Sequence, residues 1–238
     1  MAFIRGANTV TDGLVLSLDA ANTKSYPGSG TTWKDMSGNG NNGTLTNGPT
    51  FNSANGGSIV FDGINDYCIL PLTNIVIGNN QQNITVSQWV KYTSSIRLYS
   101  LALKRADADG SLISIVMNSI NGGGVISVGS IELLYRSPSN VFVFNNHTDG
   151  YNNGQWYMIT GTFSSTEGKL YINGELKTTT NTGLLSSANS PYNSFVGAFA
   201  VDQLWFNGNI ANTSIYTRTL SASEVLQNYN AQKSRFEL

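Results

Sequence analysis

Few residues in this chain have the types and spacing that covalent catalysis requires. Hydrolysis of a glycosidic bond uses two carboxylates that flank the bond. The glutamates are instead isolated from one another along the sequence: Glu132, Glu167, Glu175, Glu224 and Glu237. His147, the only histidine, lies in the polar stretch NNHTDG, which is typical of a surface turn, and no nucleophile motif accompanies it. The sequence therefore predicts that the protein is not an enzyme.

Two polar segments carry side-chain oxygens that suit a hard cation such as Ca²⁺. One contains Asp107 and Asp109, and the other contains Asn145, Asn146 and Asp149. Neither segment has the spacing of a defined calcium motif, and Asp and Asn also form turns through bonds to their own backbone. Both readings remain open: Ca²⁺ held by Asp107, Asp109, Asn145 and Asp149, or the same residues used as turn formers.

Aromatic residues in predicted loops indicate a different kind of site. Sugar rings stack on aromatic faces while amides and carboxylates bind the hydroxyl groups. The candidates for glycan binding fall in or near predicted loops: Tyr151, Tyr192, Trp205 and Phe206. The alternative is that they anchor the loops by packing. Trp89 and Trp156 lie within predicted strands and are assigned to the core.

The elements that must position these residues are strands. From Asn153 to Lys177, apolar and polar side chains alternate with the period of a strand, and Asn173 with Gly174 suits a two-residue type I′ turn. Comparable runs between residues 98 and 144 precede it at about ten-residue spacing, as in a sandwich or barrel. Ser221 and Glu224 form a capping box, which predicts a short helix from Ser221 to about Ala231 that packs through Val225, Leu226 and Tyr229. Residues 22–57 are predicted to form a long irregular excursion, which Trp33 attaches to the body of the domain. Predicted strands cover residues 14–18, 59–61, 67–70, 84–92, 98–104, 112–117, 125–128, 131–135, 141–144, 195–201 and 208–216.

The composition favours a single all-β domain. Only 11% of the 238 residues are charged, while Gly, Ser, Thr and Asn are abundant, which favours short strands joined by hydrogen-bonding turns. A net charge of −1 without a Lys/Arg cluster argues against nucleic acid, and no run of residues is suited to span a membrane. Residues 1–10 lack the apolar core of a secretory signal peptide. Cys68, the only cysteine, is expected to be buried.

Four sequence blocks, in this order, resemble the concanavalin A-like lectin/glucanase superfamily in its laminin G-like, pentraxin-type branch: IVFDGINDYCIL, ITVSQWVKY, GQWYMITGTFSSTEGKLYINGELK and FNGNIANTSIYTRTLSASEVLQNYNA. The resemblance implies an all-β jelly-roll sandwich of two antiparallel sheets over residues 13–232, with a short C-terminal helix. Residues 1–12 would be an N-terminal arm and residues 233–238 a C-terminal tail. Many relatives hold Ca²⁺ at the sandwich rim. The Glu-x-Asp-x-(x)-Glu strand of the retaining glucanases is missing here.

Residues 13–51 also resemble the start of stand-alone laminin G-like proteins found among tailed-phage virion components. The first hypothesis is therefore a non-enzymatic structural or adhesion protein of the virion, either a capsid decoration or a tail-associated module. Such a protein would be made in the host cytoplasm and would bind other virion proteins or form a homo-oligomer. The alternative is a soluble carbohydrate-binding module, with or without Ca²⁺, whose partners are cell-surface glycans.

Overall fold

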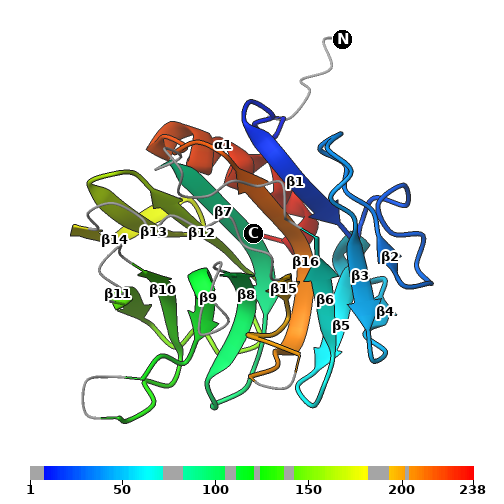
Figure 1. The fold of residues 1–238 in the computed structure, drawn as a ribbon, viewed down its shortest axis with the longest axis horizontal. Helices are drawn as coiled ribbons and strands as arrows, with labels where there is room; N and C mark the ends of the chain where they lie inside the picture. The colour runs from blue at the N-terminus through cyan, green and yellow to red at the C-terminus, as the bar shows by residue number, and fades with distance from the viewer. Residues whose placement is uncertain are drawn as a thin grey trace.

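The chain folds into two antiparallel β-sheets packed face to face, with one helix near the C-terminus (Figure 1). This computed structural model describes residues 8–71, 83–104, 111–120, 124–136, 142–181, 193–201 and 204–238. The arrangement confirms the predicted all-β sandwich with a short C-terminal helix. In the described part of the chain, no helix has the length and apolar character needed to cross a bilayer.

Sheet A is built around the long strand β16, which pairs with β7 on one side and with both β1 and β5 on the other. From β7 the sheet continues through β12 and β13 to β14 at its edge, and from β5 it continues to β4. Its strands are β1 (Leu14–Asp19), β4 (Thr50–Asn52), β5 (Ser58–Asp62), β7 (Ile84–Lys91), β12 (Tyr157–Phe163), β13 (Glu167–Ile172), β14 (Glu175–Asn181) and β16 (Asn207–Tyr216).

Sheet B runs from β11 at one edge through β10, β9, β8, β15, β6 and β3 to β2. Consecutive strands β8 to β11 form an antiparallel meander, and β15 inserts between β8 and β6. Its strands are β2 (Thr32–Trp33), β3 (Gly43–Thr46), β6 (Tyr67–Leu70), β8 (Leu98–Lys104), β9 (Ser111–Met117), β10 (Ser130–Arg136), β11 (Phe142–Thr148) and β15 (Ser194–Val196).

The two faces of sheet A bury different clusters, as the period-two alternation of its strands requires. On β7, Val86 and Val90 point into the core between the sheets, whereas Trp89 joins a second apolar cluster on the outer face. Trp33 and Cys68 belong to the central core and are fully buried, as predicted. Burial raises the pKa of the Cys68 thiol, which keeps this group protonated and inert.

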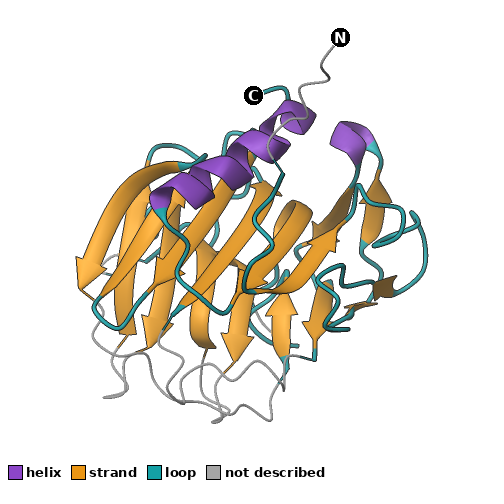
Figure 2. Ribbon diagram, turned by 90° about the horizontal axis from the view of Figure 1, so that it is seen from above, coloured by secondary structure: helices purple, strands orange, loops and turns teal. Residues whose placement is uncertain are grey.

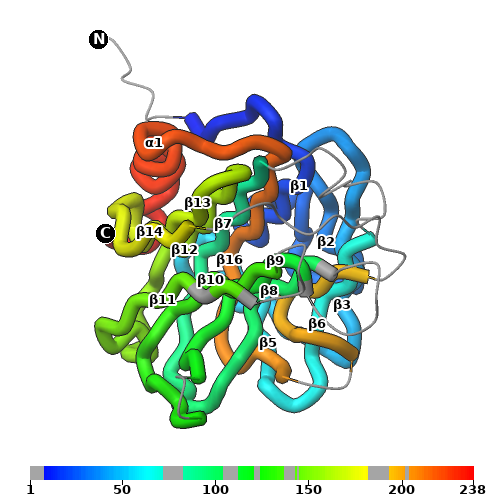
Figure 3. The backbone as a smooth tube through the Cα atoms, turned by 60° about the vertical axis from the view of Figure 1, so that its left-hand side comes forward, coloured from blue at the N-terminus to red at the C-terminus, as the bar shows by residue number. Residues whose placement is uncertain are grey.

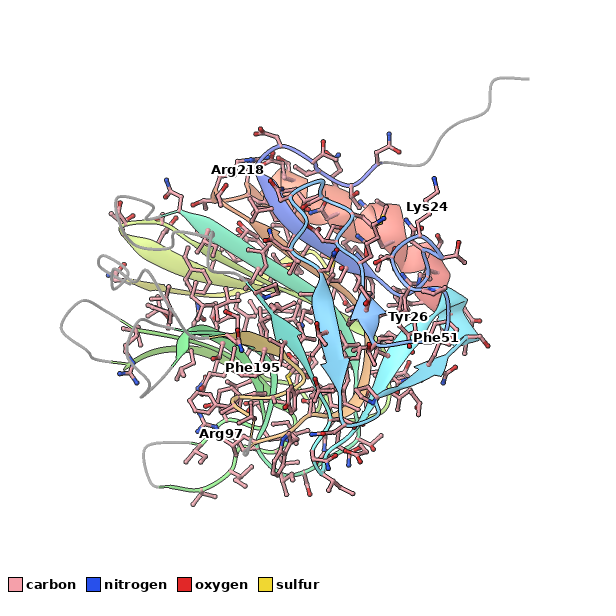
Figure 4. The ribbon with its side chains drawn as sticks, turned by 45° about the vertical axis from the view of Figure 1, so that its right-hand side comes forward. Lys24, Tyr26, Phe51, Arg97, Phe195 and Arg218 are labelled. Carbon is pink, nitrogen blue, oxygen red and sulfur yellow. The ribbon has the colours of Figure 1, made fainter. Side chains whose placement is uncertain are left out.

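Helix α1 (Ala222–Gln232) and the 3₁₀ turn η2 (Lys233–Phe236) cover part of the outer face of sheet A (Figure 2). Phe236 stacks on Trp89 with the ring centroids 4.1 Å apart. The predicted capping box is confirmed, because Ser221 Oγ accepts from the Glu224 amide and Glu224 Oε2 accepts from the Ser221 amide. Arg218 lies beside the start of the helix (Figure 4) and pairs with Glu224.

The described residues at both ends of the chain pack on this helix layer. Val10 is 8% exposed, and its amide donates to Asn228 Oδ1 over 2.7 Å. At the other end, Phe236 is 5% exposed, and Arg235 Nη1 pairs with Asp19 Oδ1 over 2.8 Å. Val10 and Phe236 therefore add to the apolar cluster on the outer face of sheet A.

The segment between β1 and β5, predicted to be a long irregular excursion, contains β2, β3, β4 and the 3₁₀ turn η1 (Ala54–Gly56). A buried carboxylate organises its polar loop. Asp35 Oδ1 accepts the amides of Ser17 and Ser37, each over 2.9 Å. Asp35 Oδ2 accepts the Ser37 hydroxyl over 2.7 Å and the Asn41 amide over 3.0 Å.

The predicted strand at residues 125–128 is wrong. The structure has a single bridge there, between Ile126 and Ile120, and Val125 is 62% exposed. Its apolar residues resemble a strand in sequence, but the connection extends past the end of the ladder between β9 and β10, which stops at Met117 and Ile131. Alternation of residue types cannot show where a neighbouring strand ends.

Candidate functional site

A small pocket of about 150 Å³ opens at the lateral edge of the sandwich. Sheet A provides the start of β12, the end of β13, the turn that follows and the start of β14, while the segment after β11 comes from sheet B. Figure 3 shows β11 and β14 side by side along this edge. We call it the rim pocket, and it is lined by Asp149, Tyr151, Tyr157, Ile172, Asn173, Glu175 and Lys177.

Two tyrosines form the aromatic wall of the rim pocket. Tyr157 is partly exposed and packs edge to face against Tyr151, with ring centroids 5.0 Å apart and an interplanar angle of 81°. Asn153 Nδ2 donates to Tyr157 Oη over 2.9 Å, which fixes the ring at its tip. Ile172 adds a buried apolar contact. A sugar ring can stack its apolar face on a tyrosine held in this way.

Charged and amide groups surround this wall. Lys177 Nζ contacts Glu175 Oε2 at 2.8 Å, and this interaction lowers the pKa of Glu175. Glu175 is therefore an ionised acceptor at neutral pH. Among the described lining residues, the carboxylates of Asp149 and Glu175 against the ammonium of Lys177 leave one net negative charge. Asn173 Oδ1 accepts the Met158 amide over 2.8 Å, so the side-chain N–H groups of Asn173 remain for a ligand.

Tyr151 and His147 form a hydrogen-bonded pair behind the aromatic wall. The Tyr151 hydroxyl lies 2.8 Å from His147 Nδ1. Burial, and next the charge of Asp149, raise the pKa of Tyr151 to about 12, so the phenol stays protonated at neutral pH. His147 lies in β11 and not in the surface turn that was predicted, because NNHT continues the ladder with β10, where His147 pairs with Ile131. Its side-chain partner is thus a tyrosine, not a catalytic serine.

The structure separates the predicted glycan-binding aromatics. Tyr151 borders the rim pocket but is 3% exposed. Phe206 is fully buried, with Phe61 and Tyr92 each 6.3 Å away between ring centroids, so it offers no face to a sugar. Trp205 is partly buried against the cluster of Tyr67 and Phe195 on the outer face of sheet B. Tyr192 lies outside the described residues.

The described residues do not fit a calcium site. Asn145 is 1% exposed, and its Nδ2 donates to the Gly168 carbonyl over 2.9 Å while its Oδ1 accepts from the Thr178 hydroxyl. Its amide oxygen therefore ties β11 to sheet A. Among the predicted ligands, Asp149 is the one carboxylate that the structure describes, because Asp107 and Asp109 lie outside the described residues. In the described part of the chain, no three His, Cys, Asp or Glu residues are grouped to hold a metal ion.

Sequence reasoning missed most of the rim pocket, because it assigned the segment from Asn153 to Lys177 to structure. Tyr157 is predicted to be sheet or core and Asn173 a turn residue, and both predictions are confirmed, because Tyr157 lies in β12 against the core and Asn173 has a φ of 52°. Both residues also line the pocket. One signal was present in the sequence: Glu175 and Lys177 are two residues apart at the start of a strand, and so they share a face. The sequence could not show that the segment after β11 would lie against them.

Solved structures with a similar fold include binding domains of botulinum neurotoxins and of Paraclostridial Mosquitocidal Protein 1. The binding domain of Paraclostridial Mosquitocidal Protein 1 matches with a TM-score of 0.71 and 18% identity, over 93% of this chain and 52% of that chain. The receptor binding domain of botulinum neurotoxin D matches with a TM-score of 0.70 and 19% identity, over 93% and 53%. The botulinum neurotoxin serotype D ligand binding domain in complex with N-acetylneuraminic acid matches with a TM-score of 0.67 and 18% identity, over 94% of this chain and 52% of that chain. At these identities the likeness shows the fold alone.

This chain spans about half the length of those domains. No curated protein matches its sequence. A family model, Laminin_G_3, described as the concanavalin A-like lectin/glucanases superfamily, matches residues 62–226, which is well over half of the chain. The matched region runs from the end of β5 through both sheets into helix α1, and it includes every lining residue of the rim pocket. The chain therefore belongs to the concanavalin A-like lectin/glucanase superfamily, as the sequence blocks indicated.

Proposed function

We propose that this chain is a non-enzymatic carbohydrate-binding module that holds a neutral sugar in the rim pocket. The observation that carries the proposal is the combination of a partly exposed, hydrogen-bonded Tyr157 with two carboxylates and a free amide around it. Carboxylates accept hydrogen bonds from sugar hydroxyls, and an amide can donate to them, while the ring covers the C–H face. This combination is the recognition chemistry that a polyol requires.

The size and charge of the rim pocket restrict the ligand. A volume of about 150 Å³ is below the ~300–1,000 Å³ of sites that enclose a whole small molecule, so one sugar ring enters and the rest of the glycan stays in solvent. The net negative charge from Asp149 and Glu175 against Lys177 disfavours acidic sugars by like-charge repulsion. Neutral hexoses and N-acetylhexosamines at a glycan terminus are the expected ligands.

A glycan array followed by titration calorimetry with the best hit tests this function. Tyr157→Ala removes the stacking face and should weaken binding by about tenfold or more. Asp149→Asn keeps the shape of the side chain but removes an anionic acceptor, and it should also weaken binding. Trp205→Ala is the matched control, because it removes an aromatic residue outside the pocket, and it should leave binding unchanged.

Each comparison has a clear contrary outcome. If Trp205→Ala abolishes binding while Tyr157→Ala does not, the rim pocket is not the site. If the array shows no binding with or without added Ca²⁺, the proposal that this chain binds carbohydrate is rejected. Near-identical circular dichroism spectra of the variants and the parent chain would exclude unfolding as the cause of any change.

A second candidate function is a structural component of a tailed-phage virion, in which the lectin-like domain decorates the capsid or tail. It is supported by residues 13–51, which resemble virion proteins. These residues lie outside the family match, yet they contribute β1 and β4 to sheet A and β2 and β3 to sheet B. The two functions are compatible, because an exposed virion protein can also bind cell-surface sugars. Mass spectrometry of purified particles tests this role, and absence of the chain from the particles would reject it.

A further inference from the structure

A larger polar cleft of about 350 Å³ lies on the outer face of sheet A, away from the rim pocket. It occupies the part of that face where β5, β16 and β7 lie side by side. Val60, Asn209 and Lys91 form a row across these three strands, because Asn209 pairs with Val60 on one side and with Lys91 on the other. Asn207, Thr93 and Gly154 complete its polar border.

Lys91 is the charged group of this cleft among the described residues that line it. Its Nζ lies 5.2 Å from the centroid of the Trp156 ring, and Trp156 is itself fixed by a 3.1 Å bond from its Nε1 to Asn55 Oδ1. A cation–π contact holds the ammonium in place but does not neutralise it. No carboxylate in the described part of the chain forms an ion pair with Lys91.

The nearest acidic residue along the strands does not supply that counter-charge. Asp62 pairs with Asn207 in the ladder between β5 and β16. Its Oδ1 accepts the amide of Ile64 over 2.8 Å and that of Asn65 over 3.3 Å, within its own turn, and Asp62 is not among the residues that line the cleft. The cleft thus carries one positive charge, in contrast to the negative rim pocket.

Val60 and Phe61 give the cleft apolar lining, and three further residues supply uncharged hydrogen-bonding groups. Asn209 Nδ2 donates to Ser58 Oγ over 3.1 Å, which orients the amide and leaves Oδ1 as an acceptor. Asn207 and Thr93 are exposed and provide an amide and a hydroxyl. At Gly208 a side chain is excluded, because its Cβ would lie 2.4 Å from the Lys91 carbonyl oxygen.

We propose that this cleft is a second binding site, specific for a saccharide that carries a carboxylate. The Lys91 ammonium would bind the carboxylate, and Asn207, Asn209 and Thr93 would bind the ring hydroxyls. The volume falls in the ~300–1,000 Å³ range of small-molecule sites, which is enough to enclose an acidic sugar. The site differs from the rim pocket in residues, face of the sheet and charge, so it does not depend on the function proposed there.

The test uses the full ¹⁵N-labelled chain and follows the side-chain amide signals of Asn207 and Asn209 by NMR. Three probes are titrated separately at millimolar concentration: glucuronic acid, glucose and acetate. We expect saturable shifts with glucuronic acid. The dissociation constants of glucose and acetate should each be at least about tenfold higher, because glucose lacks the carboxylate and acetate lacks the ring hydroxyls.

Charge variants locate the interaction. Lys91→Gln should weaken glucuronic acid binding by about tenfold or more, and Lys91→Arg should restore part of it, since a charge-assisted hydrogen bond is roughly twice as strong as a neutral one. Lys24→Gln, at an exposed lysine that lines neither site, is the matched control and should leave the affinity for glucuronic acid unchanged. Lys177→Gln removes the lysine of the rim pocket and shows whether glucuronic acid binds there instead. The dispersion of the amide spectrum reports whether each variant is folded.

Several results would overturn the proposal. Equal shifts with glucose would remove the role of the carboxylate, and equal shifts with acetate would reduce the site to a simple anion contact. Loss of glucuronic acid binding in Lys177→Gln or Tyr157→Ala, with Lys91→Gln unaffected, would assign the ligand to the rim pocket. If the cleft does not bind glucuronic acid, the proposal that the rim pocket binds a neutral glycan at Tyr157 still stands. If the rim pocket does not bind a glycan, the proposal for the cleft still stands, so the two experiments are independent.

Discussion

At the scale of single residues, the fold depends on a carboxylate that is buried although its residue type is usually exposed. Asp35 is 5% exposed and accepts four hydrogen bonds from Ser17, Ser37 and Asn41. These donors saturate both carboxylate oxygens, so Asp35 is occupied as a structural acceptor. It also connects β1 with the loop that precedes β3, which carries the N-terminal segment onto the core.

Replacing Asp35 with Ala should lower the free energy of unfolding by about 3 kcal/mol, because buried backbone donors would lose their acceptor. Ser37→Ala, which removes one donor hydroxyl, should cost about 1 kcal/mol. Glu237→Gln, at an exposed carboxylate, should stay within about 0.5 kcal/mol of the parent chain. Urea unfolding measures all three. A loss for Asp35→Ala no larger than that for Glu237→Gln would contradict this account of the loop.

At the scale of elements, the hydrogen bonds and the ion pair of Glu224 fix where helix α1 begins. Glu224 Oε1 lies 2.5 Å from Arg218 Nη2, and Glu224 Oε2 accepts the Ser221 amide over 2.9 Å. The bond to Arg218, and next the bond to Ser221, lower the pKa of Glu224 to about 2. Val225 is buried as predicted, whereas Leu226, also predicted to pack, is 46% exposed. The sequence located the helix better than it located the packing face.

The lowered pKa of Glu224 predicts how stability depends on pH. Its folded value lies below its ordinary value of 4.5, so its contribution is complete above pH 4.5 and disappears as the pH falls toward about 2. Glu224→Gln should cost about 1 kcal/mol at pH 7 and progressively less as the pH falls to 3. Urea unfolding of both proteins at several pH values checks this. A gap that stays constant from pH 7 to pH 3 would mean that Glu224 is not the titrating group.

At the scale of the whole molecule, polar bonds between the sheets fix how the two layers sit on one another. Gln88 of β7 donates through Nε2 to the Ser100 carbonyl of β8 over 3.1 Å, inside the core. Asn145 of β11 makes the second connection at the lateral edge, where it binds Gly168 and Thr178. This edge connection lies on the same side of the sandwich as the rim pocket, so it helps to keep β11 and β14 in position.

Asn145→Ala should therefore lower the melting temperature by about 5 °C, through the loss of about 2 kcal/mol of hydrogen bonding. Because the amide oxygen is bound by the Thr178 hydroxyl, the loss should be the same in EDTA and in excess Ca²⁺. Differential scanning calorimetry under both conditions measures it. A destabilisation seen with Ca²⁺ but absent in EDTA would show that Asn145 is a cation ligand and not a connection between sheets.

The sequence by itself determined the all-β class of this protein, the start of its helix and one of its turns, because strand alternation, the capping box and the Asn173-Gly174 turn are local features. Asn173 and Gly174 have φ values of 52° and 80°, as a type I′ turn requires. Four ordered blocks were enough to identify the family, which the match over residues 62–226 confirmed. Such features depend on residues that are neighbours in the chain.

Only the tertiary structure decided which side chains meet at a site. Tyr157 and Asp149 lie at the rim pocket because β11 and β14 approach one another across two sheets. Lys91 and Asn209 share the cleft because β7 pairs with β16, more than a hundred residues away in the chain. The burial of Phe206 has the same origin, since its partners Phe61 and Tyr92 come from distant segments. Strand order and sheet packing arise from non-local contacts, and residue type alone does not encode them.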